Sequence, residues 1–301
     1  MEIQPNTQVT FVNLTFIGNN HYIISNKGNL KLINCSFKDN SLGLISNNGE
    51  LELENCKIED INQFYQTRPT DNDGLIINTK TLKITNTAFN NNNHYLPYNY
   101  PTETTNLKGI IYSTGKLYAN NVNFTNINYR IIYNDGEISL NNTLFENIIS
   151  TSSRAIYIIS TNQQLSEKYK YNNYKIQSIS KTMNGGVIYN NNQSIVIDSR
   201  FENVVGSNGG VIYNNKDLTI LNSTFQKITG NDGGTLYNNN SLTIINSTIH
   251  TTKGNAGGAI YNNNRLIIIS SLINNTRCNN LLPPSTTRNE PRSSCRCCVS
   301  S

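Results

Sequence analysis

The sequence contains little charge and few of the side chains that carry chemistry. It has no tryptophan, only 3 histidines, and 14% charged residues in a chain of 301 residues. The formal net charge is +5, but four arginines and one glutamate put +3 of it in residues 277–301, which leaves about +2 for the rest of the chain. Because no basic stripe results, we expect no nucleic-acid partner.

Long apolar runs and a leader are also missing. No segment approaches the ~20 apolar residues that a membrane helix needs, so we expect no membrane span in this chain. Residues 1–5 lack the basic start and the apolar stretch of a signal peptide. The repeat described below is already under way by residues 9–16 without a polar unit to cap it, which favours an interior or C-terminal piece of a longer protein.

Low charge and abundant asparagine would fit a disordered chain, but the apolar residues recur at fixed positions. The stretch Gly-Gly-x-Ile-Tyr-Asn-Asn, with Leu for Ile in one copy, occurs at residues 185–191, 209–215, 233–239 and 257–263, always 24 residues apart. A fixed short period predicts a stack of equivalent units, a solenoid, rather than one rounded core.

Ten units fit the template G-x-I-Y-N-N-x-x-L-x-I-x-N-x-x-F, with 21–24 residues in each regular unit. The Leu and Ile positions alternate with polar residues, as is typical of a strand, and the Phe position adds an apolar column after a turn. Three short strands close one coil, so the sequence predicts an all-β parallel β-helix of about ten coils over residues 1–276. The units are expected to begin at Tyr22, Gly43, Gly74, Gly109, Arg130, Arg154, Gly186, Gly210, Gly234 and Gly258.

Asparagine recurs at the thirteenth template position, just before the turn that leads to the Phe column. Stacked side-chain amides there are expected to hydrogen-bond from coil to coil and to stabilise the bend. The residues are Asn34, Asn55, Asn86, Asn121, Asn142, Asn222 and Asn246, with Asp198 and Ser270 in two other units.

A column of tyrosines follows the first core position. An exposed ladder of this kind could stack on sugar rings or present a flat surface to a protein, and the alternative is aromatic stacking that stiffens a half-buried turn. The column contains Tyr112, Tyr133, Tyr157, Tyr189, Tyr213, Tyr237 and Tyr261.

Insertions interrupt the period at about residues 62–73 and 92–108, both at the same corner of the template. Stacking should bring them side by side on one edge, where repeat proteins often build binding surfaces. They contain Tyr65, Tyr95, Tyr98 and Tyr100, which we predict as binding residues; loops without function are the alternative. A third loop, residues 158–172, is expected to leave from another corner.

The sequence contains few residues whose types and spacing indicate catalysis. The three histidines fall at unrelated template positions, so stacking brings no two of them together. Asp198, Arg200 and Glu202 form the only acid–base–acid cluster in the strands, and the stacked residues of the next coil offer no second carboxylate. We therefore expect no catalytic residues, no metal site and no cofactor, and interpret this cluster as a solvated, self-paired face.

Two cysteines of the repeat share one template position. Cys35 and Cys56 lie on adjacent coils, with Cα atoms expected about 4.8 Å apart, so a disulfide and two stacked free thiols are both open.

The other four cysteines lie in residues 277–301, a Cys/Arg/Ser/Pro tail that we expect to be disordered. Its C-x-C-C sequence is a weak zinc signal without a histidine or a CxxC partner.

N-x-S/T sequons are many, and an Asn- and Thr-rich repeat generates them by composition. They permit export without establishing it. They include those that begin at Asn13, Asn34, Asn123, Asn222, Asn246 and Asn274.

These motifs resemble those of the right-handed parallel β-helix, or pectate-lyase-like, superfamily over residues 9–276. The G-G-[VAT]-[IL]-Y pattern is similar to the GGAI motif of polymorphic outer membrane proteins and of adhesin-like, Asn/Thr-rich surface proteins of methanogenic archaea; residues 257–260 match it in full. The companion FxxN motif is present at Phe37–Asn40 and Phe89–Asn92, and three other units have Phe-x-Asn.

The resemblance implies a cell-surface or secreted adhesin that binds glycans or proteins of a host or neighbouring cell. The superfamily's enzymes imply the alternative, a polysaccharide lyase or glycoside hydrolase, and a passive wall or spacer protein is the third reading.

Overall fold

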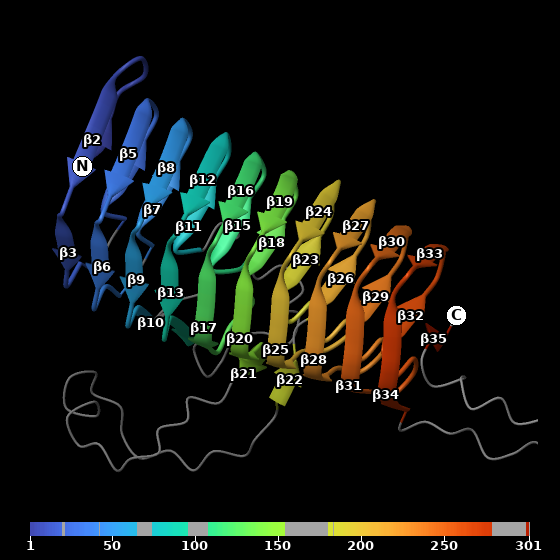
Figure 1. Cartoon of the computed structure of the whole chain (residues 1–301). Coiled ribbons are helices and arrows are strands. Elements are labelled where there is room, and N and C mark those ends of the chain that lie inside the picture. The colour runs from blue at the N-terminus through green and yellow to red at the C-terminus, as the bar shows by residue number, and fades with distance from the viewer. Residues whose placement is uncertain are drawn as a thin grey trace, which may run out of the picture.

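The computed structural model describes residues 1–19, 22–41, 43–64, 74–95, 108–153, 180–182, 184–278 and 299–300. The regular structure of these residues consists of strands, most of which stack into three parallel sheets around one long core (Figure 1). The molecule is a right-handed parallel β-helix, which confirms the fold predicted from the period.

Each sheet takes one strand from every coil. The first sheet contains β1 (Glu2–Ile3), β4 (Ile24–Asn26), β7 (Ile45–Asn47), β11 (Ile76–Asn78), β15 (Ile111–Ser113), β18 (Ile132–Asn134), β23 (Ile188–Asn190), β26 (Ile212–Asn214), β29 (Leu236–Asn238), β32 (Ile260–Asn262) and β35 (Val299–Ser300). The second contains β2 (Gln8–Val12), β5 (Asn29–Ile33), β8 (Glu50–Glu54), β12 (Thr81–Thr85), β16 (Lys116–Asn120), β19 (Glu137–Asn141), β24 (Ser194–Ile197), β27 (Leu218–Leu221), β30 (Ser241–Ile245) and β33 (Arg265–Ile269). The third contains β3 (Thr15–Ile17), β6 (Ser36–Lys38), β9 (Lys57–Glu59), β13 (Ala88–Asn90), β17 (Asn123–Ile127), β20 (Leu144–Ile149), β25 (Arg200–Val205), β28 (Thr224–Thr229), β31 (Thr248–Gly254) and β34 (Leu272–Cys278).

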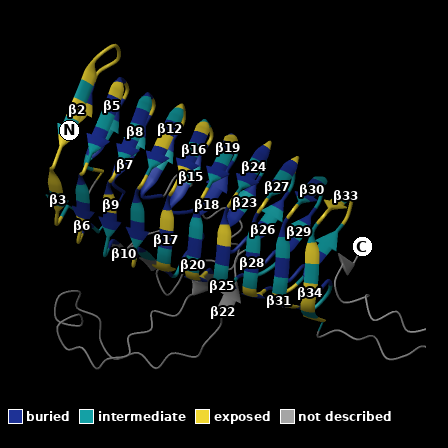
Figure 2. Cartoon of the chain, viewed as in Figure 1, coloured by how far each residue is buried: buried dark blue, intermediate teal, exposed yellow. Residues whose placement is uncertain are grey.

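The apolar columns of the template form the core. Phenylalanine rings of the third sheet stack on one another, as in Phe124 and Phe145, whose centroids are 5.0 Å apart with 3° between their planes. The Ile column of the first sheet and the Leu and Ile columns of the second are also buried. Buried residues run the length of the rod, and exposed residues are frequent on its end coils (Figure 2).

One predicted unit is wrong. The unit expected to begin at Arg154 is not a coil, because β18 pairs directly with β23 and the core column passes from Ile132 to Ile188. Residues 154–179 are an insertion between two coils. The motif Arg-x-Ile-Tyr matches the start of the template, but Asn162 and Gln164 stand where the template has Leu and Ile, so the sequence lacks the apolar pair of a second-sheet strand. The ten coils are instead completed by β1, β2 and β3 at the N-terminal end.

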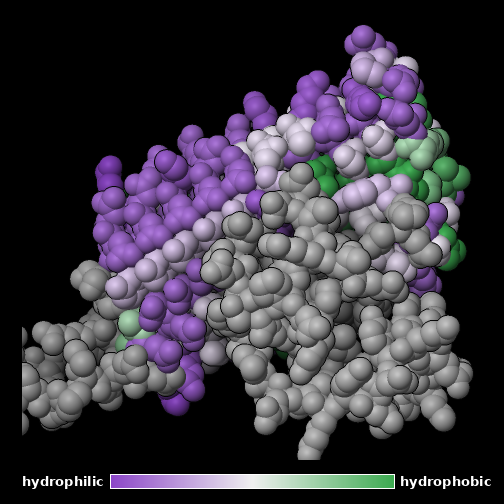
Figure 3. All heavy atoms as spheres, turned by 180° about the vertical axis from the view of Figure 1, so that it is seen from behind, coloured by the Kyte–Doolittle hydropathy of each residue, from purple (hydrophilic) through white to green (hydrophobic). Residues whose placement is uncertain are grey.

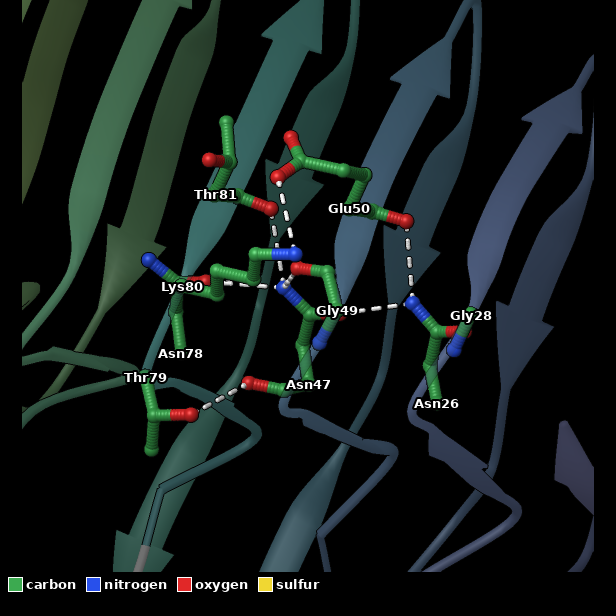
Figure 4. A network of polar contacts seen from close by, with 9 residues as sticks. All are labelled: Asn26, Gly28, Asn47, Gly49, Glu50, Asn78, Thr79, Lys80 and Thr81. Atoms are coloured by element: carbon green, nitrogen blue, oxygen red, sulfur yellow. Dashed lines mark hydrogen bonds and ion pairs between the residues drawn. The ribbon is translucent and has the colours of Figure 1, made fainter. Parts of the chain in front are cut away.

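A ladder of buried amides runs inside the turn between the first and second sheets (Figure 4). Asn47 Nδ2 donates to Asn78 Oδ1 at 2.8 Å and to the carbonyl oxygens of Gly49 and Thr81 at 2.9 and 2.8 Å, and the side chain is fully buried. The same pattern links Asn190, Asn214, Asn238 and Asn262. Because buried carbonyl groups without partners are costly, these amides allow the backbone to turn inside the core.

The thirteenth template position adopts the left-handed conformation, for which asparagine is the best of the residues that carry a side chain. Asn86 and Asn121 have φ of 50° and 54°, and Asn121 Nδ2 donates to Asn86 Oδ1 at 2.7 Å. The predicted corner is thus present, and its amides bond from coil to coil in the middle of the rod.

Candidate functional site

The first two insertions leave the rod next to each other. Short strands β10 (Asn62–Phe64) and β14 (Asn93–Tyr95) follow the third-sheet strands of consecutive coils and pair in parallel. The register aligns Asn62 with Asn93 and Phe64 with Tyr95. The described starts of the two insertions, β10 and β14, therefore lie side by side at one corner, as the template predicts.

The third insertion leaves from this same corner, and the expectation of a different corner was wrong. It begins after β20 with β21 (Thr151–Ser153), which pairs antiparallel with β22 (Ser180–Thr182) before the first-sheet strand β23. The error follows from reading residues 154–157 as the start of a coil. All three insertions thus connect the third sheet to the first, along one edge.

The predicted binding tyrosines of this edge are only partly described. Tyr95 ends β14, where it is paired with Phe64. Tyr65, Tyr98 and Tyr100 lie outside the described residues, as does Tyr157.

The tyrosine column of the first sheet is a continuous stack. The ring centroids of Tyr189 and Tyr213 are 5.2 Å apart with 4° between their planes, and those of Tyr213 and Tyr237 are 4.8 Å apart with 9°. Tyr133 and Tyr261 extend the stack at each end, both with centroid distances of 4.9 Å. Neighbouring rings cover both faces of the central tyrosines, so a ligand would meet ring edges and hydroxyl groups there.

A second amide ladder holds this stack from outside. Asn215 Nδ2 donates to Asn191 Oδ1 at 2.8 Å and to the hydroxyl of Tyr189 at 3.3 Å. Asn239 and Asn263 repeat this arrangement one and two coils further on. The face of the C-terminal coils seen from behind is mainly hydrophilic (Figure 3). The column is thus a stack of rings beside a hydrogen-bonded amide ladder, and both of its interpretations, a ligand surface and a stiffened turn, stay predictions.

Two cations lie at one end of the stack, close to where the second and third insertions rejoin the coil. Lys108 Nζ lies 4.0 Å from the ring centroid of Tyr133, and the guanidinium carbon of Arg130 lies 5.1 Å from that of Tyr189. Arg130 is only 2% exposed and donates to the carbonyl oxygen of Asn184 at 2.9 Å. Such cation–π contacts are strongest when they are desolvated.

Burial governs the ionisation of this cluster. It lowers the pKa of Arg130 and, with the carboxylate of Asp135 nearby, raises the pKa of Tyr133 to about 12. The tyrosine is therefore a neutral phenol at neutral pH. Sequence reasoning treated Arg130 as a variant of the glycine that begins a unit, and no pattern in the sequence marked it as buried.

The acid–base–acid cluster is self-paired, as expected. Arg200 donates to Glu202 Oε2 from two nitrogens, at 2.6 and 3.2 Å, and Lys227 Nζ lies 2.9 Å from Glu202 Oε1. These two cations hold the pKa of Glu202 at about 2. Asp198 occupies the left-handed corner, with φ of 49°.

Cys35 and Cys56 are free thiols in the structure, and both are 1% exposed. Cys56 Sγ donates to the carbonyl oxygens of Leu32 and Glu54, each at 3.4 Å. Burial raises the pKa of the Cys56 thiol, which disfavours the reactive thiolate.

Within the described ranges, no group of three or more metal-ligating side chains comes together, and no helix there has the length and apolar character of a membrane span. No protein-family model matches the chain, and no curated protein matches its sequence.

Proposed function

We propose that this chain is a non-catalytic, adhesin-like binding protein of the cell surface or the extracellular space. It holds a glycan, or a surface protein of another cell, on the edge marked by β10 and β14, after which residues 65–73 and 96–107 follow in the sequence. The pairing of β10 with β14 carries the proposal, because it gives two tyrosine-containing insertions adjacent starting points on one rod. Sugar recognition commonly uses aromatic side chains with polar groups nearby, and both insertions contain them in sequence.

The rod itself supports binding more than turnover. A binding edge needs a rigid scaffold, which the stacked tyrosines and the two amide ladders supply. The alternative of a polysaccharide lyase or hydrolase would depend on Asp198, Arg200 and Glu202. A carboxyl group with a pKa of about 2 carries no proton at neutral pH and is a weak base, so Glu202 is poorly suited to general acid–base catalysis.

The test compares loop variants of the full chain for binding to a glycan array and to whole cells. One variant lacks residues 65–73 and 96–107, each replaced by a short Gly-Ser link, and a second keeps both loops but replaces Tyr65, Tyr95, Tyr98 and Tyr100 by Ser. Each is expected to lose at least about tenfold in affinity, equivalent to about 1.4 kcal/mol. Circular dichroism would verify that the rod is intact.

Tyr118→Ser is the matched control. Tyr118 lies in β16 of the second sheet, away from the edge, so its replacement should leave binding unchanged. Unchanged binding by both loop variants would move the site elsewhere on the rod. An intact chain that binds neither glycans nor cells would favour the passive spacer.

A further inference from the structure

The corner between the second and third sheets is an exposed column of left-handed residues. All ten coils contribute one residue, with φ between 46° and 58°, and all ten are exposed. Eight are asparagines, at positions 13, 34, 55, 86, 121, 142, 222 and 246. Their side chains are therefore open to solvent along the whole column.

Four of these asparagines begin sequons, and their amides differ from the rest. The sequon residues are Asn13, Asn34, Asn222 and Asn246. Among the described residues their side-chain amides make no hydrogen bond, whereas three of the four non-sequon asparagines are tied together. Asn121 Nδ2 donates to Asn86 Oδ1 at 2.7 Å, and Asn142 Nδ2 donates to Asn121 Oδ1 at 3.2 Å. The sequon amides are therefore available to react.

The residue before each corner asparagine also differs between the sequon and the non-sequon coils. This residue ends a second-sheet strand and faces outward. Before the four sequons it is apolar, namely Val12, Ile33, Leu221 and Ile245; before the other four asparagines it is Glu54, Thr85, Asn120 and Asn141. Val12 is 48% exposed, and the other three apolar residues are partly exposed.

The two coils without a corner asparagine also fit this arrangement. Ile197 and Ile269 precede Asp198 and Ser270, which cannot accept a glycan on an amide. Each is directly paired with an apolar residue that precedes a sequon, Ile197 with Leu221 and Ile269 with Ile245. Since neighbouring strands lie about 4.8 Å apart, a group attached at the sequon would cover both side chains of each pair.

We propose that Asn13, Asn34, Asn222 and Asn246 are N-glycosylation sites, and that their first sugars cover the outward apolar column of the second sheet. The proposal rests on the export that the proposed function requires. The donor is a lipid-phosphate-activated oligosaccharide supplied by the exporting cell. The asparagine Nδ2 forms a bond to the anomeric carbon, the bond from that carbon to the phosphate oxygen breaks, the lipid phosphate leaves with the electron pair, and one amide proton goes to a base.

Site occupancy is the first measurement. The full chain, given a cleavable secretory leader, is expressed in an N-glycosylating host, and each sequon is mapped by peptide mass spectrometry after enzymatic deglycosylation. Asn222 and Asn246 are expected to be glycosylated in most molecules. Unmodified asparagines at both positions in the secreted, leader-cleaved protein would overturn the proposal.

Coverage of the apolar column is the second measurement, made with an apolar fluorescent dye. Thr224→Val with Thr248→Val removes two sequons and keeps both corner asparagines, and Thr219→Val with Thr243→Val makes the same chemical change on outward residues of β27 and β30 without touching a sequon. The double variant that lacks the two sequons is expected to bind about twofold more dye than the control double variant. Without the two glycans its apolar column is exposed, and exposed apolar patches bind such probes. Equal dye binding with the glycans present would contradict the covering role.

A third variant tests whether a glycan lowers dye binding when the corner residue has no apolar residue before it. Ala88→Thr creates a sequon at Asn86, where the preceding residue is the polar Thr85. A glycan there should leave dye binding unchanged, and a decrease would mean that any sugar on the rod has this effect. The corner lies between the second and third sheets, whereas the insertions lie between the third and the first. Glycan or cell binding by the same variants therefore tests the proposed function, and dye binding tests the glycosylation proposal.

Discussion

Many side chains in this protein contact the equivalent side chains of the coils before and after them, so one substitution affects three coils. The two asparagines that follow the tyrosine position show this most clearly. Asn214 is 1% exposed and bonded to the coils before and after it, whereas Asn215 lies on the outer side and braces the tyrosine stack. The sequence contains both asparagines without indicating which one points inward. Only the strand register decides that.

Asn214→Ala should therefore cost much more than Asn215→Ala. The first change leaves the amide of Asn190 without its acceptor and Asn238 Oδ1 without its donor, and it removes the donor that Asn214 Nδ2 provides to the carbonyl of Ser241. We expect a loss of about 2–4 kcal/mol in the free energy of unfolding, against less than about 1 kcal/mol for the outer residue. Urea denaturation of both variants measures the difference. Equal losses would contradict the structural role of the inner ladder.

The ion pairs of Glu202 predict a stability that depends on pH. The pKa of this carboxyl falls from an ordinary value of 4.5 to about 2 in the folded chain, so its contribution is complete above about pH 5 and is lost as the pH falls toward 2. We expect Glu202→Gln to lose about 1 kcal/mol at pH 7, since both cations are exposed to solvent, and almost nothing at pH 2. Unfolding at both values provides the test. A deficit that persists at pH 2 would mean that packing, not charge, is responsible.

At the scale of elements, the strands and core columns could be predicted from the sequence, because a period fixes them. The insertions could not be placed in the same way. Residues 154–157 carry the template's first motif, but a coil also needs the apolar pair of the second sheet, and Asn162 and Gln164 stand where the template has Leu and Ile. The first-sheet strand of the first coil, β1, could not be predicted because Ile3 stands where later coils have asparagine.

Removing the third insertion should leave the fold unchanged. Because Ser153 pairs with Ser180 in an antiparallel ladder, an Asn-Gly turn can replace residues 154–179 and close a short hairpin. We expect the Tm to change by less than about 3 °C, since shortening a surface loop alters chain entropy only slightly. Thermal unfolding followed by circular dichroism measures it. A drop of more than about 10 °C would mean that this segment belongs to the stack.

At the scale of the whole molecule, the two end coils of the rod expose apolar side chains. Val12, Leu14 and Ile17 are 48%, 42% and 60% exposed on the N-terminal coil, where apolar residues also gather in Figure 3. Ile269 and Leu272 are 48% and 53% exposed on the last coil. On the first coil, β2 and β3 are the outermost strands of the second and third sheets. Open strand edges with apolar neighbours favour pairing with another chain.

End-to-end association should therefore depend on the first coil. Light scattering of the intact chain is expected to show a mass that rises with concentration, and Val12→Lys with Ile17→Lys should reduce that rise. Ile149→Lys is the matched control, because Ile149 is 50% exposed on the flank of the rod. A monomer at every concentration in the intact chain, or an equal effect of the flank variant, would contradict association through the ends.

We propose that this rod binds its ligand without changing it. The most direct measurement incubates the intact chain with an excess of a labelled glycan that it retains, or of acidic polysaccharide if the array gives none, and follows the length of the sugar chains by chromatography. We predict stoichiometric capture and release of chains of unchanged length. Shortened products that accumulate beyond one equivalent per protein, and that Glu202→Gln or Asp198→Ala abolishes, would contradict the claim and establish an enzyme.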